Sequence, residues 1–161
     1  LEVSNFDNKK VKDMSRMFSK MEKIENLNVE NFDTGKVNEI DGMFAFDKKL
    51  GYVNVSNFNT SNVRNMIELF YGCENLTSLD VSKFNTSKVG MMHGMFGKCI
   101  SLELLDLSNF NLENCNNFYE MFDDCQNLTI ILDNNNEHYG KLLSYIPDYV
   151  TISDKNENNF K

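Results

Sequence analysis

Residues 76–99 read LTSLDVSKFNTSKVGMMHGMFGKC, and this stretch decides the predicted fold. Its first half has the L-x-x-L-x-L spacing of leucine-rich repeats, with Leu79 and Val81 on one face of an extended chain. Residues 85–87, which follow Phe84, are typical of a turn that caps a helix. The second half carries apolar residues at helical spacing, namely Val89, Met92, Met95, Phe96 and Cys99. The stretch therefore predicts one short strand, a capped turn and a helix of about three turns.

The same pattern returns every 26 residues without an insertion or deletion. Two columns are phenylalanine throughout: Phe6, Phe32, Phe58, Phe84 and Phe110, and Phe18, Phe44, Phe70, Phe96 and Phe122. Three more columns are apolar: Val11, Val37, Val63, Val89 and Cys115; Met14, Ile40, Met66, Met92 and Phe118; and Met17, Met43, Leu69, Met95 and Met121. A unit of this size cannot bury its apolar face alone, so neighbouring units should stack. We therefore predict an α/β fold, a leucine-rich-repeat-like solenoid of five 26-residue strand-turn-helix coils over residues 1–130.

The period fails after residue 130, and residues 131–161 are expected to form a C-terminal cap and a tail. Within them, 133–136 reads as a polar loop, 137–146 as a short helix and 149–152 as a final strand, with a frayed tail over 156–161. The other end differs, because Leu1 already occupies a strand position. We expect an uncovered first coil, which implies either a fragment of a longer array or an end covered by a partner chain.

The segments LDVSKFNTSKV (79–89) and LDLSNF (105–110) resemble the 26-residue repeat of bacterial surface proteins, a BspA-like relative of the leucine-rich repeats found in mycoplasma-type lipoproteins. The resemblance covers residues 1–130 and rests on the period, the strand, the turn and the M-F-x-x-C helix end occurring together. Residues 45–49 of the second repeat depart from this pattern. The resemblance implies a cell-surface or secreted protein that functions in adhesion or partner binding, and it implies no particular ligand.

The composition argues against two classes of partner. The formal net charge is -8, with 16 Lys plus Arg against 24 Asp plus Glu, so we expect no nucleic-acid binding. No run of 18 apolar residues occurs, which predicts no direct membrane insertion, and the first 12 residues have no features of a signal peptide.

The residues that could carry chemistry have structural explanations. Cys73, Cys99 and Cys125 share one column, where helices packed 8 to 10 Å apart would keep the thiols unpaired, and Cys115 replaces a core valine. No C-x-x-C pair accompanies the two histidines, His93 and His138, so a zinc site is not expected. Neither a nucleophile with a histidine at a familiar spacing nor a glycine-rich phosphate loop is present. We expect no enzyme activity and no cofactor.

One polar column follows the phenylalanines: Asp7, Asp33, Asn59, Asn85 and Asn111. Asp and Asn at such positions favour turns held by side-chain-to-backbone hydrogen bonds. Calcium binding is the alternative, but the change from Asp to Asn along the column removes the charge that it needs.

The outward face of the predicted strands is the candidate binding site, because stacking makes it one continuous surface. Three columns point outward: Asn26, Tyr52, Ser78, Leu104 and Ile130; Glu2, Asn28, Asn54, Asp80 and Asp106; and Ser4, Glu30, Ser56, Ser82 and Ser108. The candidate binding residues are Tyr52, Asn54, Ser56, Ser78, Asp80, Ser82, Leu104, Asp106 and Ser108. Short polar side chains suit hydrogen bonding to a protein or glycan ligand, and the apolar members add a strip that a fully solvated face does not need.

The sequence thus predicts a non-enzymatic, surface-displayed binding or adhesion module. The alternative is a structural spacer or an assembly subunit of a longer repeat array, with end-on self-association at the uncapped N-terminus. A scaffold inside the cell also stays open, since buried reduced cysteines fit either compartment.

Overall fold

The computed structural model describes residue 3 and residues 6–156. The strands are β1 (Asn26–Leu27), β2 (Tyr52–Val53), β3 (Leu104–Asp106), β4 (Thr129–Leu132) and β5 (Thr151–Asp154), and the one helix in these residues is α1 (Tyr139–Leu143). They form two parallel sheets, β1-β2 and β3-β4-β5, and most of the remaining chain is turns. The predicted solenoid of five strand-turn-helix coils is therefore wrong. The sheets are short, and the repeat segments expected to be helices are not helical.

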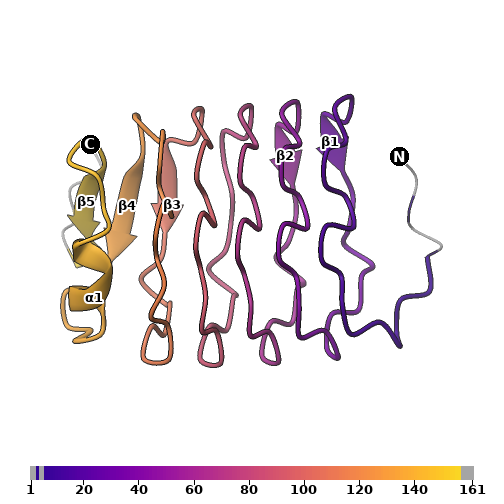
Figure 1. Ribbon diagram of the computed structural model, residues 1–161, viewed down its shortest axis with the longest axis horizontal. Helices are drawn as coiled ribbons and strands as arrows, with labels where there is room; N and C mark the ends of the chain where they lie inside the picture. Colours follow the sequence, from indigo (N-terminus) through magenta and orange to yellow (C-terminus); the bar gives the residue numbers. More distant parts are fainter. Residues whose placement is uncertain (1–2, 4–5, 157–161) are drawn as a thin grey trace.

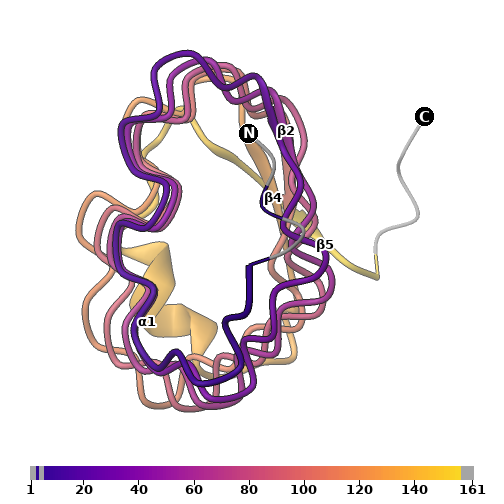
Figure 2. The same cartoon turned by 90° about the vertical axis from the view of Figure 1, so that its right-hand side faces the viewer.

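Each expected helix is replaced by what we call a turn row: residues 13–20, 39–46, 65–72, 91–98 and 117–124. Successive turn rows are joined by parallel bridges at 26-residue intervals, such as Asp13 to Glu39 and Glu39 to Asn65. Figures 1 and 2 show the consequence: successive segments lie side by side and follow nearly the same outline, with β2, β4 and β5 along one side. The 26-residue period is thus realised in the structure, although not as helices.

Left-handed backbone at two positions in every turn row prevents an α-helix. The first position is Arg16, Gly42, Glu68, Gly94 and Glu120, and the second is Lys20, Phe46, Gly72, Lys98 and Asp124, all with φ between 53° and 72°. An α-helix of L-residues has φ near -63°, so it cannot continue through these positions. The chain instead makes consecutive tight turns, as in the bond from the Leu69 N–H to the Met66 carbonyl.

The backbone N–H groups that a helix would use internally are donated to the next turn row. In the third row the N–H groups of Met66, Glu68, Phe70 and Gly72 donate to the carbonyls of Met91, His93, Met95 and Gly97, at 2.8 to 3.0 Å. The first, second and fourth rows donate to their next rows in the same way. These cross-row bonds satisfy backbone groups that would otherwise be buried without partners.

The predicted apolar columns form the core from the second repeat onward, whereas in the first repeat Phe6 is exposed and Val11 and Met17 are only partly buried. Phe18, Phe44, Phe70, Phe96 and Phe122 are buried and stacked, with neighbouring ring centroids 5.3 to 6.1 Å apart. The four cysteines are free and buried, and three of them donate the thiol to a carbonyl 29 residues earlier, for example Cys73 to Phe44 at 3.1 Å. The buried columns of the second to fifth repeats were therefore predicted correctly, whereas the backbone conformation was not.

The polar column after the phenylalanines forms turns, as expected. Asn85 Oδ1 accepts the N–H of Ser87 at 3.1 Å, and Asn59 and Asn111 hold equivalent turns. The bonds between neighbouring segments come from the adjacent buried threonines. Thr86 Oγ1 accepts the N–H of Asn111 and donates to its carbonyl, and Thr60 does the same to Asn85. The turns are thus fixed both within each repeat and between repeats.

The C-terminal segment contains the expected elements at shifted positions. α1 is shorter than the predicted 137–146, and β5 begins two residues after the predicted start. Tyr139 of α1 is buried and donates its hydroxyl to the Leu107 carbonyl at 2.5 Å. β4 pairs with β3 at an offset of 25 residues, which aligns Ile130 with the buried Leu105. The prediction that Ile130 points outward is therefore wrong. Leu1, Glu2, Ser4 and the tail from 157 lie outside the described residues.

Candidate binding face

Two exposed apolar side chains dominate the face that the strands present. Tyr52 in β2 is 53% exposed and Leu104 in β3 is 43% exposed, although both lie beside buried strand residues. Ser78, between them in the repeat order, is also exposed and belongs to no strand. Alternation along the strand explains the arrangement, since the neighbours Val53 and Leu105 point into the core. We call this surface the strand face.

Tyr52 and Leu104 border a surface hollow of about 380 Å³. Of the nine sequence-derived candidates, six line it: Tyr52, Asn54, Ser78, Asp80, Leu104 and Asp106. The remaining three, Ser56, Ser82 and Ser108, do not. Each of these serines instead donates its backbone N–H to the Asn or Asp two residues earlier, as Ser82 does to Asp80 at 2.9 Å. The serines thus hold the turns that position the polar side chains.

The hollow is acidic. Asp80, Glu103 and Asp106 line it, and no lysine or arginine does so among the described residues. The Ser82 hydroxyl and N–H donate to the Asp80 carboxylate, which lowers the pKa of Asp80. An ionised carboxylate only accepts hydrogen bonds, so a ligand placed here must supply donors.

Two further hollows adjoin the first, and the predicted outward columns contain most residues of the smaller hollow but only Asn26 of the larger one. A hollow of about 150 Å³ lies between β1 and β2 and shares Tyr52 and Asn54 with the first, so the tyrosine stands between two depressions. A larger hollow of about 630 Å³ is lined by Glu25, Asn26, Lys49, Gly51, Asn75, Thr77 and Ser101. Thr77 also lines the first hollow.

A signal for the missed residues was present in the repeat. Glu25, Gly51, Thr77 and Glu103 form one column at 26-residue intervals, immediately before the outward positions. The side chains of this column are small in the middle, at Gly51 and Thr77, and long at its two ends, where the residues are glutamates. A Cβ at Gly51 would make only ordinary van der Waals contacts, with the carbonyl oxygens of Glu25 and Asn75 at 3.8 and 3.9 Å.

The groups considered for catalysis or metal binding lie elsewhere. His93 stacks on Tyr119 with ring centroids 5.4 Å apart, and His138 is the residue that precedes α1. Burial raises the pKa of all four cysteine thiols, which keeps them protonated. Residues 6–156 contain no cluster of three or more His, Cys, Asp or Glu side chains able to hold a metal ion. Within the same residues, α1 is too short to span a bilayer.

The geometry defines a repeat protein built of stacked turns, whose strand face is hollowed and carries carboxylates. The chain belongs to the family described as "Mycoplasma protein of unknown function, DUF285", whose model matches residues 1–78 and 45–141. This agrees with the expected mycoplasma-type repeat family and does not single out the BspA-like proteins. No curated protein and no solved structure matches the chain.

Proposed function

We propose that the protein is a non-enzymatic binding or adhesion module displayed on the cell surface or secreted, and that the strand face is its ligand-binding surface. The observation that carries the proposal is the 380 Å³ hollow, which combines exposed apolar side chains with carboxylates. Scattered apolar side chains need no explanation, whereas their combination with a hollow and a polar rim is typical of interfaces. The cell-surface location is supported by the sequence resemblance alone.

The chemistry of the hollow favours a protein ligand. The ring of Tyr52 and the side chain of Leu104 suit an apolar side chain, and aromatic residues are common binding anchors. Asp80, Glu103 and Asp106 suit a lysine or arginine beside it. We therefore expect a segment that carries a basic residue next to an apolar one. A glycan, which would offer hydroxyl donors, is the competing outcome of the test.

The test is binding of the purified chain to arrays of extracellular proteins and glycans. The double variant Tyr52→Ala, Leu104→Ala should lose binding of the ligand that the wild type retains. Met91→Ala is the matched control, because Met91 is 41% exposed, close to Leu104 at 43%, but lies in the fourth turn row, outside the strand face. Equal loss in both variants would contradict a localised site.

A second variant tests the acidic rim without disturbing the backbone. Asp80→Asn keeps the oxygen that accepts the Ser82 N–H and removes the charge. Binding should weaken, and its dependence on salt should decrease. If the wild type binds nothing on either array, the strand face loses its proposed role and the spacer or assembly alternative replaces it.

A further inference from the structure

The fifth turn row and the C-terminal segment border a hollow of about 380 Å³ that is separate from the strand face. It is lined by Tyr119, Glu120 and Asp123 of the turn row and by residues 144–147, which follow α1. It shares no residue with the three hollows described above. We call it the C-terminal hollow.

Two tyrosine rings in this hollow are exposed, and each is fixed by a neighbouring ring. Tyr119 is 58% exposed and stacks on His93, with ring centroids 5.4 Å apart and an angle of 9° between the ring planes. Tyr145 is 42% exposed, and its ring packs against the buried Phe118 with centroids 5.9 Å apart. The contacts leave much of both rings uncovered. The two tyrosines therefore form a pre-positioned aromatic surface, which lowers the ordering cost of binding.

The C-terminal hollow also carries negative charge. Glu120 and Asp123 line it, and no lysine or arginine of the described residues does so. A hydrogen bond to Glu120 and the charges of Glu120 and Asp123 raise the pKa of Tyr119, as a negative local potential requires. Ring faces and carboxylates both attract cations. The molecule itself contains such a contact, because Lys98 Nζ lies 5.7 Å from the centroid of the Tyr71 ring.

We propose that the C-terminal hollow binds an arginine side chain of a partner protein. A guanidinium group is planar, so it stacks on aromatic rings, and its N–H groups form paired hydrogen bonds with carboxylates. Tyr119 and Tyr145 supply the rings, and Glu120 and Asp123 supply the carboxylates. A lysine ammonium would use the charge but could not stack in this way.

The arginine should belong to a polypeptide. The α-carboxylate of the free amino acid would be repelled by Glu120 and Asp123, whereas a residue within a chain has no such charge. This proposal does not depend on a ligand at the strand face.

The test is an NMR titration of the full chain with N-acetyl-arginine methylamide, in which the ring signals of Tyr119 and Tyr145 are followed. These signals should shift to saturation. The citrulline analogue, which has nearly the same shape and no charge, should leave them unchanged. The lysine analogue should bind about threefold more weakly, because it loses the stacking on the rings.

Three results of the titration would overturn the proposal: no saturable shift with the arginine probe, an equal response to citrulline, or tighter binding of lysine or of free arginine. If the probe shifts signals of Tyr52 alone, this proposal fails while the strand face keeps its proposed role.

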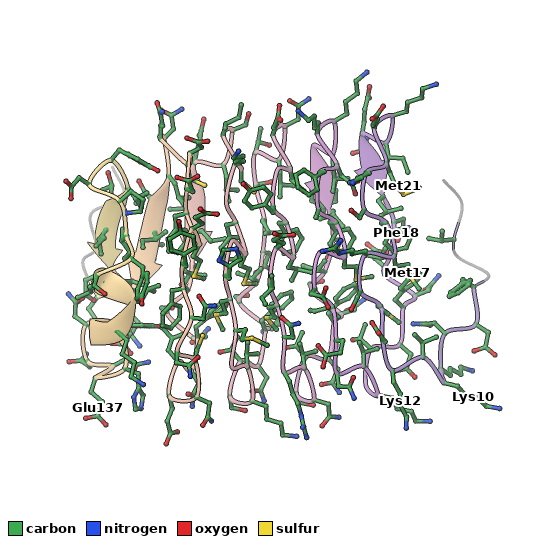
Figure 3. All side chains as sticks on the ribbon, viewed as in Figure 1. Lys10, Lys12, Met17, Phe18, Met21 and Glu137 are labelled. Carbon is green, nitrogen blue, oxygen red and sulfur yellow. The ribbon has the colours of Figure 1, made fainter. Side chains whose placement is uncertain are left out.

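Substitutions locate the charge that the probe recognises. Glu120→Gln and Asp123→Asn should each raise the Kd of the arginine probe about threefold, the effect of one exposed ion pair. Glu137→Gln is the matched control, because Glu137 is exposed at the α1 end of the molecule (Figure 3) and does not line the hollow. Its Kd should equal that of the wild type. An equal increase in all three variants would show a general effect of net charge and would overturn the proposed site.

Discussion

Asp47 is a buried carboxyl group in a column that is otherwise cysteine in the later repeats. Its side chain is 1% exposed and accepts the N–H of Met21 at 2.6 Å. Burial raises the pKa of Asp47 from 3.8 to about 6, and the hydrogen bond from Met21 opposes the increase. The ionised form is therefore costly in the folded state. Replacing Asp47 should stabilise the protein above pH 6.

The sign and size of the effect of Asp47 on stability follow from its pKa in the unfolded state, 3.8, and in the folded state, about 6. Between pH 3.8 and about 6 the folded state keeps a proton that the unfolded state has released, so stability falls as the pH rises. The stability that the bound proton of Asp47 contributes is fully present below pH 3.8 and is lost above about pH 6. At about 1.4 kcal/mol per pKa unit, the loss amounts to at most about 3 kcal/mol. Asp47→Asn preserves an acceptor for Met21 and removes this titration.

The assay is urea unfolding of the wild type and Asp47→Asn at intervals from pH 3.5 to 8. Each curve gives a free energy of unfolding by linear extrapolation. The difference between the two proteins isolates Asp47, because the carboxyl groups with lowered pKa values, those of Asp13, Asp80 and Asp133, are common to both. The variant should gain about 2 to 3 kcal/mol relative to the wild type between pH 4 and 7. A constant difference across that range would refute the assignment of a buried, titrating carboxyl.

Other substitutions test the remaining features. Gly42→Ala should cost about 1 to 2 kcal/mol, because φ is +57° and the Cβ would approach the Arg16 side chain at 3.1 Å, whereas Gly90→Ala should stay within about 0.5 kcal/mol in thermal unfolding. Phe96→Ala should lower the free energy of unfolding by about 3 to 5 kcal/mol, because it leaves a cavity in the core. A loss below about 1 kcal/mol in urea unfolding would contradict the stacked phenylalanine column. Tyr139→Phe should lower the free energy of unfolding, measured by the same method, by about 1 to 2 kcal/mol, because it removes the hydrogen bond to the Leu107 carbonyl. The four thiols should resist a thiol reagent in the native protein and all react after unfolding without reductant.

The apolar spacing predicted which residues are buried but not the backbone that buries them. In the fourth repeat, Met92, Met95, Phe96 and Cys99 are completely buried, as the pattern required. Spacings of three and four residues place side chains on one side of a helix, and they do the same in a succession of tight turns. The deciding feature is the left-handed backbone at Gly94 and its equivalents. Only some of those positions are glycine, so the sequence carried a weak signal.

The candidate face was predicted from the same repeat, with two kinds of error. Tyr52 and Leu104 are exposed as expected, because the alternation of short strands is local and simple. Ile130 was misplaced because β4 begins one residue early relative to the period, at an offset of 25. Its run of apolar residues is buried on both faces, so alternation gives no register there. Glu103 was missed because alternation along the strand assigns residue 104, and not residue 103, to the outward face.

Cross-row hydrogen bonding is the central feature of this fold, since it replaces the expected helices and fixes how successive repeats stack. It is tested most directly by NMR of the labelled protein in the third and fourth turn rows. The N–H of Phe70 donates to the carbonyl of Met95, so its amide proton should show contacts with residues 95 and 96. Glu68 should have a left-handed backbone. An uninterrupted run of helical shifts through 66–73, without contacts to 91–97, would contradict the account.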